Sequence, residues 1–251
     1  MWLLLCSEND TSAMWAYQGL RRRGLLPLEL VTAEALLQGC TWEHRVGAAG
    51  ASIVVTLADG RVINNETIRG TLNRLTHVPM HKLAGAPDHD YAAQEYAAFF
   101  MSWLYALPQP VVNSTAVQGL SGAWRHASEW VSLAAQAGLP TPHYRQTSED
   151  TIDERRELRT LFPAGSPTTL FITVGDRVVG PEVPPEIRAG CLRLAQLAQT
   201  RLLGIELASD SSSNSWVFAG ATPMPDLRAG GEPLLDALAA ELYQPKVNGR
   251  S

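Results

Sequence analysis

Near the C-terminus the chain reads LGIELASDSSSNSWVFAGATPMPDL, from Leu203 to Leu227. Two runs rich in β-branched and aromatic residues, Leu203–Ala208 and Ser215–Ala219, are separated by a polar loop and followed by a proline-containing turn. Such runs around a polar loop predict a β-hairpin. Its first strand carries a single carboxylate, Glu206, and its second strand ends in the sequence Gly-Ala-Thr-Pro.

This hairpin resembles the last hairpin of the ATP-grasp ligases. In that family the first strand has an acidic residue in a Gly-Ile/Val-Asp/Glu context. The second strand ends in Glu-x-Asn-Pro, whose Glu and Asn hold the magnesium ions that bridge the ATP phosphates. Glu206 fits the first position. Aligning Pro223 with the proline of the motif places Gly220 at the position of the Glu and Thr222 at the position of the Asn.

The resemblance therefore implies a metal site that has lost most of its ligands. Magnesium requires oxygen ligands, chiefly carboxylates and phosphates, whereas glycine has no side-chain oxygen and a threonine hydroxyl is a neutral donor. Phosphoryl transfer depends on cations that neutralise charge on the transferred group. We expect no metal, no cofactor and no catalytic residue, and we interpret the chain as a pseudoenzyme.

The lysines and the spacing of the motifs indicate a second loss. The family clamps its nucleotide with lysines from a lid subdomain, but this chain has only Lys82 and Lys246. A general preference for arginine, as in a GC-rich genome, is an alternative explanation. A polar helix predicted at Thr151–Arg159 leads directly to a strand–Gly-Asp–strand hairpin at Thr168–Val179, which resembles the strands that follow the lid. We therefore expect the lid to be deleted.

The segment Trp124–Pro142 resembles the entry into the ATP domain, where a helix is followed by Ala-Gly-Ile/Leu-Pro-x-Pro. Gly138 is expected just after the helix, before an extended exit enforced by prolines. The family usually has a lysine near the start of this helix, where Arg125 or His126 stands here. The candidate ligand or partner surface comprises Arg125, His126, Arg177, Trp216 and Phe218.

The N-terminal half alternates strand and helix signals, which predicts a parallel sheet with covering helices. Trp2–Leu5 reads as the first strand, Ser12–Arg23 as a helix, and Ile68–Leu75 as helical. In Tyr91–Leu107 large apolar residues recur at helical spacing, so the aromatic stripe of this helix serves core packing or, alternatively, a ligand or partner. The stretch Val62–Leu75 resembles the pre-ATP-grasp domain of RimK-like peptide ligases.

These elements predict an α/β fold with two domains. Residues 1–113 form a pre-ATP-grasp-like domain with a parallel sheet, and residues 114–251 form a truncated, lid-less ATP-grasp-like α+β domain.

Composition excludes several classes of function. A net charge of −5 and a pI near 5.7 give no basic surface for nucleic acid. The apolar start Met1–Cys6 lacks the basic region of a signal peptide, and no stretch approaches the length of a membrane span. We therefore predict a cytoplasmic protein that contacts no membrane. Cys6, Cys40 and Cys191 are too widely spaced for a zinc site or a disulfide framework, and Cys6 is either a nucleophile or a buried thiol.

Two weaker patterns remain. His77 and His81, with Asp88, His89 and Asp90 nearby, form either a loop metal site or a polar surface loop. The Gly119–Gly122 stretch is too short for a phosphate-binding loop.

The resemblance favours a non-catalytic binding or scaffolding subunit beside a ligase or other biosynthetic enzyme, in a homo-oligomer or a heterocomplex. One alternative is an ATP-dependent carboxylate-amine ligase whose site is completed by a partner chain. The other is a repurposed cleft that uses Glu206, Asp210 and Arg177. Glu206 is expected to face solvent or to pair with Arg177. Loss of the lid is expected to expose the apolar faces of Leu170–Val179 and Leu203–Phe218.

Overall fold

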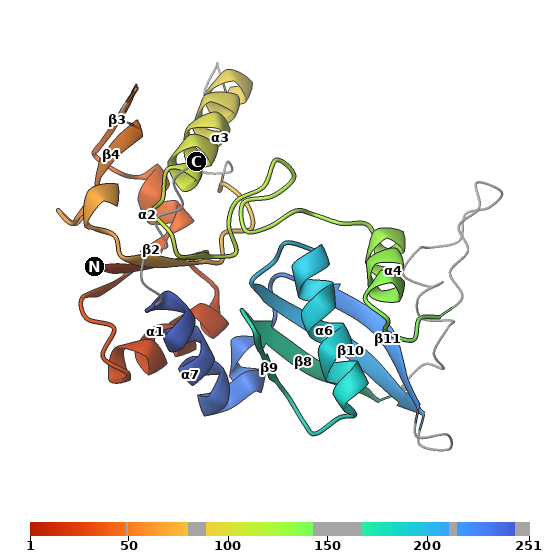
Figure 1. The fold of residues 1–251 in the computed structure, drawn as a ribbon. Coiled ribbons are helices and arrows are strands. Elements are labelled where there is room, and N and C mark those ends of the chain that lie inside the picture. Colours follow the sequence, from red (N-terminus) through yellow and green to blue (C-terminus); the bar gives the residue numbers. More distant parts are fainter. Residues whose placement is uncertain (49, 80–88, 143–166, 211–214, 244–251) are drawn as a thin grey trace. The chain divides into compact units, whose positions relative to one another are not determined.

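The structure, a computed structural model, describes residues 1–48, 50–79, 89–142, 167–210 and 215–243 (Figure 1). The chain divides into two compact units. Unit 1 comprises Met1–Ala123 and Leu235–Ser251, and unit 2 comprises Trp124–Leu234. The domain boundary expected after residue 113 stays a prediction, because units defined by packing need not coincide with the domains of a family.

A four-stranded parallel sheet in the order β2-β1-β6-β7 lies at the centre of unit 1. This sheet confirms the predicted α/β class. Its strands are β1 (Trp2–Cys6), β2 (Leu28–Thr32), β6 (Gly70–Asn73) and β7 (Val111–Val112).

The helix between the first two strands, α1, spans Thr11–Arg22, one residue earlier at each end than the predicted Ser12–Arg23. The Asp10 carboxylate caps it by accepting a hydrogen bond of 2.9 Å from the amide of Ala13. Arg21 and Arg22 lie in the last turn, where cations interact favourably with the helix dipole. The shorter helix α2 (Ala33–Leu37) follows β2 and is capped by the hydroxyl of Thr32, which accepts a hydrogen bond from the amide of Ala35.

The helix expected over Ile68–Leu75 is wrong, because Gly70–Asn73 form the strand β6 between β1 and β7. Ile68, Leu72 and Leu75 recur at steps of three and four, which imitates a helical stripe. Every residue of this strand is buried, so the alternation that marks a half-exposed strand is absent. Periodicity alone cannot distinguish such a strand from a buried helix.

A three-stranded antiparallel sheet in the order β3-β4-β5 is inserted between β2 and β6. It consists of β3 (Thr41–Gly47), β4 (Gly50–Thr56) and β5 (Val62–Asn64), followed by the short 3₁₀ helix η1 (Asn65–Thr67). The side-chain amide of Asn65 joins this sheet to Ala106. It donates hydrogen bonds to the carbonyls of Ala51 and Ala106, and it accepts one from the backbone amide of Ile53.

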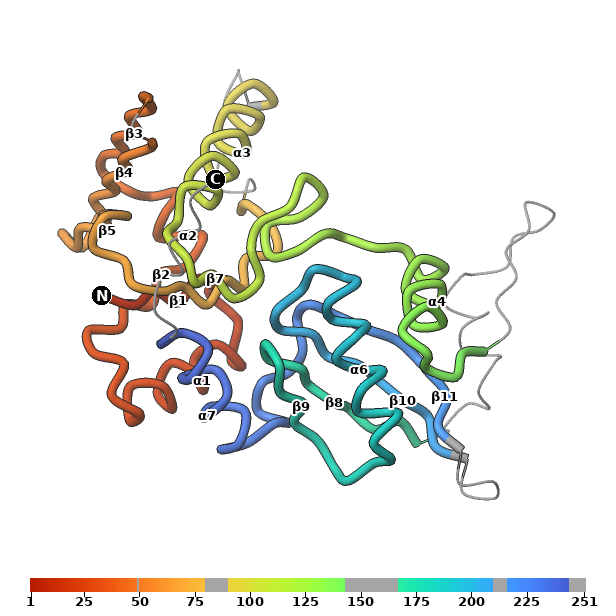
Figure 2. Tube along the Cα trace, in the orientation of Figure 1, coloured from red at the N-terminus to blue at the C-terminus, as the bar shows by residue number. Residues whose placement is uncertain are grey.

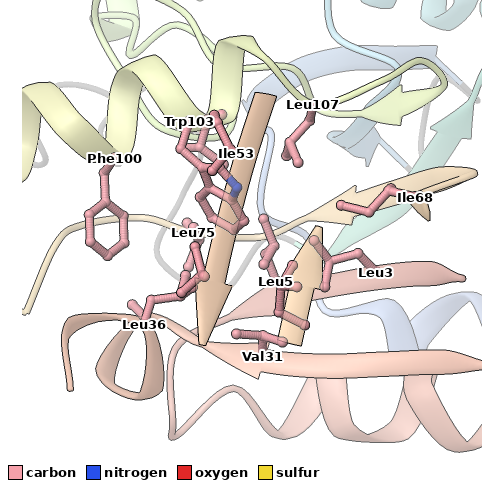
Figure 3. Packing of buried hydrophobic residues seen from close by; sticks show 14 of the residues in the cluster. Leu3, Leu5, Val31, Leu36, Ile53, Ile68, Leu75, Phe100, Trp103 and Leu107 are labelled. Carbon is pink, nitrogen blue, oxygen red and sulfur yellow. The ribbon is translucent and has the colours of Figure 1, made fainter. Parts of the chain in front are cut away.

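The long helix α3 (His89–Tyr105) carries the predicted aromatic stripe, and its inner residues pack in the core of unit 1. Figure 3 shows Phe100 and Trp103 gathered with side chains from both sheets. Core packing of the stripe is therefore confirmed for these two residues. The labelled members of the cluster are Leu3, Leu5, Val31, Leu36, Ile53, Ile68, Leu75, Phe100, Trp103 and Leu107.

The last helix, α7 (Gly231–Leu242), has its residues from Leu235 onward in unit 1. Figure 2 shows this part of the chain beside α1. A Cβ added to Gly19 of α1 would lie 2.3 Å from a methyl carbon of Leu235, so the close approach of the two helices requires glycine there. The Trp2 indole donates to the carbonyl of Leu242 at 3.3 Å, which fixes the helix end against β1.

Unit 2 contains a four-stranded antiparallel sheet in the order β11-β10-β8-β9. The two predicted hairpins are confirmed as β8 with β9 and β10 with β11. The strands are β8 (Thr168–Val174), β9 (Arg177–Val179), β10 (Leu202–Asp210) and β11 (Ser215–Thr222). The helices are α4 (Ala127–Gln136), α6 (Pro185–Leu197) and the 3₁₀ helix η3 (Leu227–Gly230). The helix predicted at Thr151–Arg159 lies outside the described residues.

None of the helices that the structure describes is long and apolar enough to cross a membrane.

The buried ion pair between Arg74 and Asp10 should contribute strongly to the stability of unit 1. The side chains are 4% and 10% exposed, and Arg74 Nε lies 2.8 Å from the Asp10 carboxylate. Asp10→Asn keeps a capping side chain but replaces the carboxylate that pairs with the buried guanidinium by a neutral amide, so we expect a loss of about 3–5 kcal/mol in the free energy of unfolding. Urea unfolding measures this loss.

The matched control is Asp236→Asn, which removes the partner of Arg23 at a carboxylate that is 64% exposed. A surface pair of this kind contributes less than about 1 kcal/mol. Equal losses in the two variants would contradict the role assigned to Asp10.

Candidate functional site

The β10–β11 pairing places the three predicted metal positions on neighbouring strands. Glu206 lies directly opposite Gly220, and Gly204 lies opposite Thr222. A β-bulge follows Glu206, so that Leu207 lies opposite Phe218. Residues directly opposite in an antiparallel pair project to the same face. Glu206, Gly220 and Thr222 therefore share one face of the sheet.

The other face of the same hairpin forms the core of unit 2. Ile205, Leu207 and Phe218 are each no more than 1% exposed and pack with Phe171 against residues of α4 and α6. Phe218 is thus not available as the ligand or partner surface expected from the sequence. Trp216 is partly buried, and its ring meets the edge of Phe171 at a centroid distance of 5.8 Å.

The expected exposure of an apolar hairpin face is also wrong. Ile172, Val174, Val178, Ile205 and Phe218 are all buried. Several of these side chains meet helices α4 and α6, which the sequence analysis had not assigned to this face. These residues therefore do not provide the exposed apolar surface on which the predicted association through the hairpins depended.

The face that carries Glu206 is open at its centre. The Glu206 side chain is exposed, and it forms no ion pair or hydrogen bond with any residue in the described part of the chain. This matches the solvent-facing alternative for Glu206. Arg177 is also exposed, on β9, with no ion pair to Glu206 among the described residues. A Cβ added at Gly220 would meet nothing within 4 Å.

The hydroxyl of Thr222 has a structural role next to this face. It accepts a hydrogen bond of 3.1 Å from the amide of Met224, within the turn that contains Pro223 and Pro225. Within the described ranges, no group of three or more His, Cys, Asp and Glu side chains could hold a metal ion. Among the described side chains of β10 and β11, this face carries one carboxylate, Glu206, too few charged oxygens for a magnesium–phosphate site.

Comparison with known proteins gives no match to any family model and none to a curated protein. Solved structures are similar over nearly the whole chain. The macrocyclase MdnB from Microcystis aeruginosa MRC has 13% sequence identity to this chain and a TM-score of 0.69. The similarity covers 96% of this chain and 99% of that one. The RiPP-associated ATP-grasp ligase of Chryseobacterium gregarium, in complex with ADP and a leader and core peptide, has 11% identity, a TM-score of 0.69 and 99% coverage of both chains.

The macrocyclase MdnC, bound with the precursor peptide MdnA and from the same Microcystis strain, has 11% identity and a TM-score of 0.68. The similarity covers 98% of MdnC and 96% of this chain. This chain has the ATP-grasp fold. At these identities the similarity concerns the fold alone.

The two residues near the expected lysine position serve the packing of α4. Arg125 forms an ion pair with Glu129, donates to the Ala198 carbonyl at 3.2 Å and lies over the ring of Trp130. His126 caps the helix through its ring nitrogen, which accepts from the amide of Ser128. Both side chains therefore fix the start of α4 in unit 2.

The exit from α4 follows the prediction. Gly138 adopts a φ of +79° after the cap residue Ala137, the left-handed conformation that favours glycine. The carbonyl of Pro140 then accepts a hydrogen bond of 2.7 Å from the amide of Phe218. The extended exit is thereby joined to β11.

Of the remaining sequence-based sites, the structure describes Cys6 fully and the histidine loop only in part. Cys6 is 1% exposed, and burial raises the pKa of its thiol to about 12, so the thiol stays protonated near neutral pH. Of the two interpretations of Cys6, the structure supports the buried thiol. His77 bonds to the neighbouring Thr76 hydroxyl, while His81 and Asp88 lie outside the described residues.

One concave site was missed by the sequence analysis. It lies in unit 1 between β3 and α3 and is lined by Trp42, Glu95, Tyr96 and Phe99. The aromatic periodicity of α3 was its only sequence signal, and no local pattern pairs that helix with Trp42.

Substitutions of two glycines test whether the β10–β11 face that carries Glu206 is open at Gly220 and closely packed at Gly204. Gly220→Ala should change the free energy of unfolding by less than about 0.5 kcal/mol, because the added methyl meets open space. Gly204→Ala should cost about 1–3 kcal/mol, since its Cβ would lie 2.8 Å from the Cβ of Pro225. Urea unfolding of the two variants side by side makes the comparison, and a large loss at Gly220 would show that the face is not open.

Proposed function

We propose that this chain is a non-catalytic ATP-grasp-like protein, a binding or scaffolding subunit that works beside a ligase or other biosynthetic enzyme. The observation that carries the proposal is the register of β10 with β11. Glu206 faces Gly220 where a second carboxylate would be needed, and the Thr222 hydroxyl is occupied by a backbone amide. A single exposed carboxylate cannot neutralise and position the phosphates of ATP together with magnesium.

The partner of such a subunit is an enzyme or a peptide of a biosynthetic system, in a homo-oligomer or a heterocomplex. Similar structures support this class of partner, since MdnC was solved with its precursor peptide and the Chryseobacterium ligase with a leader and core peptide. A subunit that keeps the fold while losing the metal ligands can retain peptide contacts without the phosphoryl chemistry. We place the protein in the cytoplasm with its partner enzyme.

The second candidate is a carboxylate-amine ligase whose ATP site is completed by a partner chain. The open space above Gly220 favours it, because side chains from another protein could reach Glu206 there. Two findings weigh against it: the structural use of the Thr222 hydroxyl and the structural use of Arg125.

Isothermal titration calorimetry of the purified chain with Mg·ATP tests the proposal. We expect no measurable heat of binding, because the face supplies one carboxylate and no lysine among the described residues of unit 2. A dissociation constant below about 100 μM, equivalent to roughly −5.5 kcal/mol, would contradict it.

A ligand-restoring variant sharpens this experiment. Gly220→Glu with Thr222→Asn returns the carboxylate and amide of the family motif, and the space at Gly220 accommodates the new side chain. We expect no ATP turnover from this double variant. ATP hydrolysis by it would indicate that only the metal ligands had been lost, which favours the ligase alternative.

A further inference from the structure

The pocket between β3 and α3 has the composition of a site for a cationic side chain. Its volume is about 260 Å³, and three of the four described residues that line it are aromatic: Trp42, Tyr96 and Phe99. The fourth is the carboxylate Glu95. Aromatic faces attract a guanidinium or ammonium group through the ring quadrupole, and an adjacent carboxylate adds a charge-assisted hydrogen bond.

The charge of the pocket has no internal counterpart. Glu95 is exposed and forms no ion pair or hydrogen bond with another described residue. The α3 helix contains Asp90 and Glu95 but no lysine or arginine. A basic group from another molecule would therefore supply the missing positive charge.

The aromatic walls are held in place before any ligand binds. The Trp42 indole donates a hydrogen bond of 3.0 Å to the Leu36 carbonyl. Its ring meets Phe99 edge-on at 4.6 Å and Trp103 at 5.8 Å. Because these contacts already fix the rings, little conformational entropy is lost on binding.

The strand beside the pocket indicates that the basic group belongs to a peptide. β3 is at the edge of its sheet, and no described strand pairs with its outer side. An edge strand leaves alternate N–H and C=O groups unpaired, and an extended peptide can bind them as an additional strand. Side chains of an added strand that lie opposite Trp42 or His44 would project to the face where α3 lies, since both residues have ring contacts with Phe99 of that helix.

We infer that unit 1 binds an extended peptide along β3 and holds one arginine side chain of that peptide in the pocket formed by Trp42, Glu95, Tyr96 and Phe99. Arginine fits better than lysine, because its planar guanidinium stacks on aromatic rings and can bind a carboxylate through two N–H groups. The inference extends the proposed function by naming the chemistry of the peptide, and it rests on that function only for the biological role of the peptide.

The test is a titration of the ¹⁵N-labelled full chain with an acetylated and amidated pentapeptide, Val-Thr-Arg-Thr-Val. The indole N–H signal of Trp42, assigned through Trp42→Phe, reports on the pocket. Two control peptides separate the contributions: one has neutral citrulline in place of arginine, and the other has proline in place of both threonines, which blocks strand pairing.

We expect saturable shifts of the Trp42 signal at peptide concentrations up to about 10 mM, enough to saturate a millimolar site. Citrulline should weaken binding about fivefold or more, because the charge of the guanidinium is lost. The proline peptide should bind more weakly by a similar factor. Glu95→Gln should weaken binding of the arginine peptide about threefold.

The matched control variant is Glu43→Gln on β3. It removes the same charge, but Glu43 alternates with Trp42 and His44 along the strand, so its side chain projects to the opposite face, where it pairs with Arg45. Binding should be unchanged in this variant.

The inference is overturned by the absence of a saturable shift at Trp42, by equal affinity for the arginine and citrulline peptides, by equal affinity for the proline peptide, or by equal effects of Glu95→Gln and Glu43→Gln. The nucleotide face takes no part in this titration, so its failure would leave the proposed loss of Mg·ATP binding standing.

Discussion

The pairing of β10 with β11 decides which side chains can act together in unit 2. Antiparallel register places Glu206 opposite Gly220, and the bulge after Glu206 places Leu207 opposite Phe218. One face of the hairpin therefore packs against α4 and α6, and the other presents a lone carboxylate beside a residue without a side chain. A shift by one residue would exchange the two faces and bury Glu206, at a large cost in free energy. The packing of the apolar face thus keeps Glu206 opposite Gly220, the two positions that the alignment with the family motif singles out.

Two of the side chains that the family motifs single out, Arg125 and Thr222, make structural contacts in unit 2. Arg125 joins the start of α4 to the end of α6, and Thr222 closes the turn after β11. Each of these side chains thus makes a hydrogen bond that holds the fold of unit 2 together.

Elements with strong local signals could be predicted from the sequence. The Gly-Asp turn, the Asp10 and Thr32 caps and Gly138 each fix a boundary through their own chemistry. The strand β6 could not be predicted, because its burial on all sides removes the alternation that identifies strands. The burial of Phe218 could not be predicted either. The alternation of side chains along a strand defines two faces, but it does not indicate which face packs against a helix. The pocket in unit 1 depends on the packing of β3 against α3, which no local pattern contains.

The capacity of the β10–β11 face to hold a metal–nucleotide complex can be measured residue by residue. Paramagnetic Mn²⁺ replaces magnesium at oxygen sites and broadens the amide signals of nearby residues, so a titration of ¹⁵N-labelled protein with Mn²⁺ and ATP reports on Glu206 and Gly220 separately. Under the proposed loss of the metal ligands, the Glu206 and Gly220 signals should broaden no more than the signal of Glu43, an exposed residue of β3. Selective loss of the Glu206 and Gly220 signals at substoichiometric Mn²⁺ would contradict the account and restore this face as a nucleotide site.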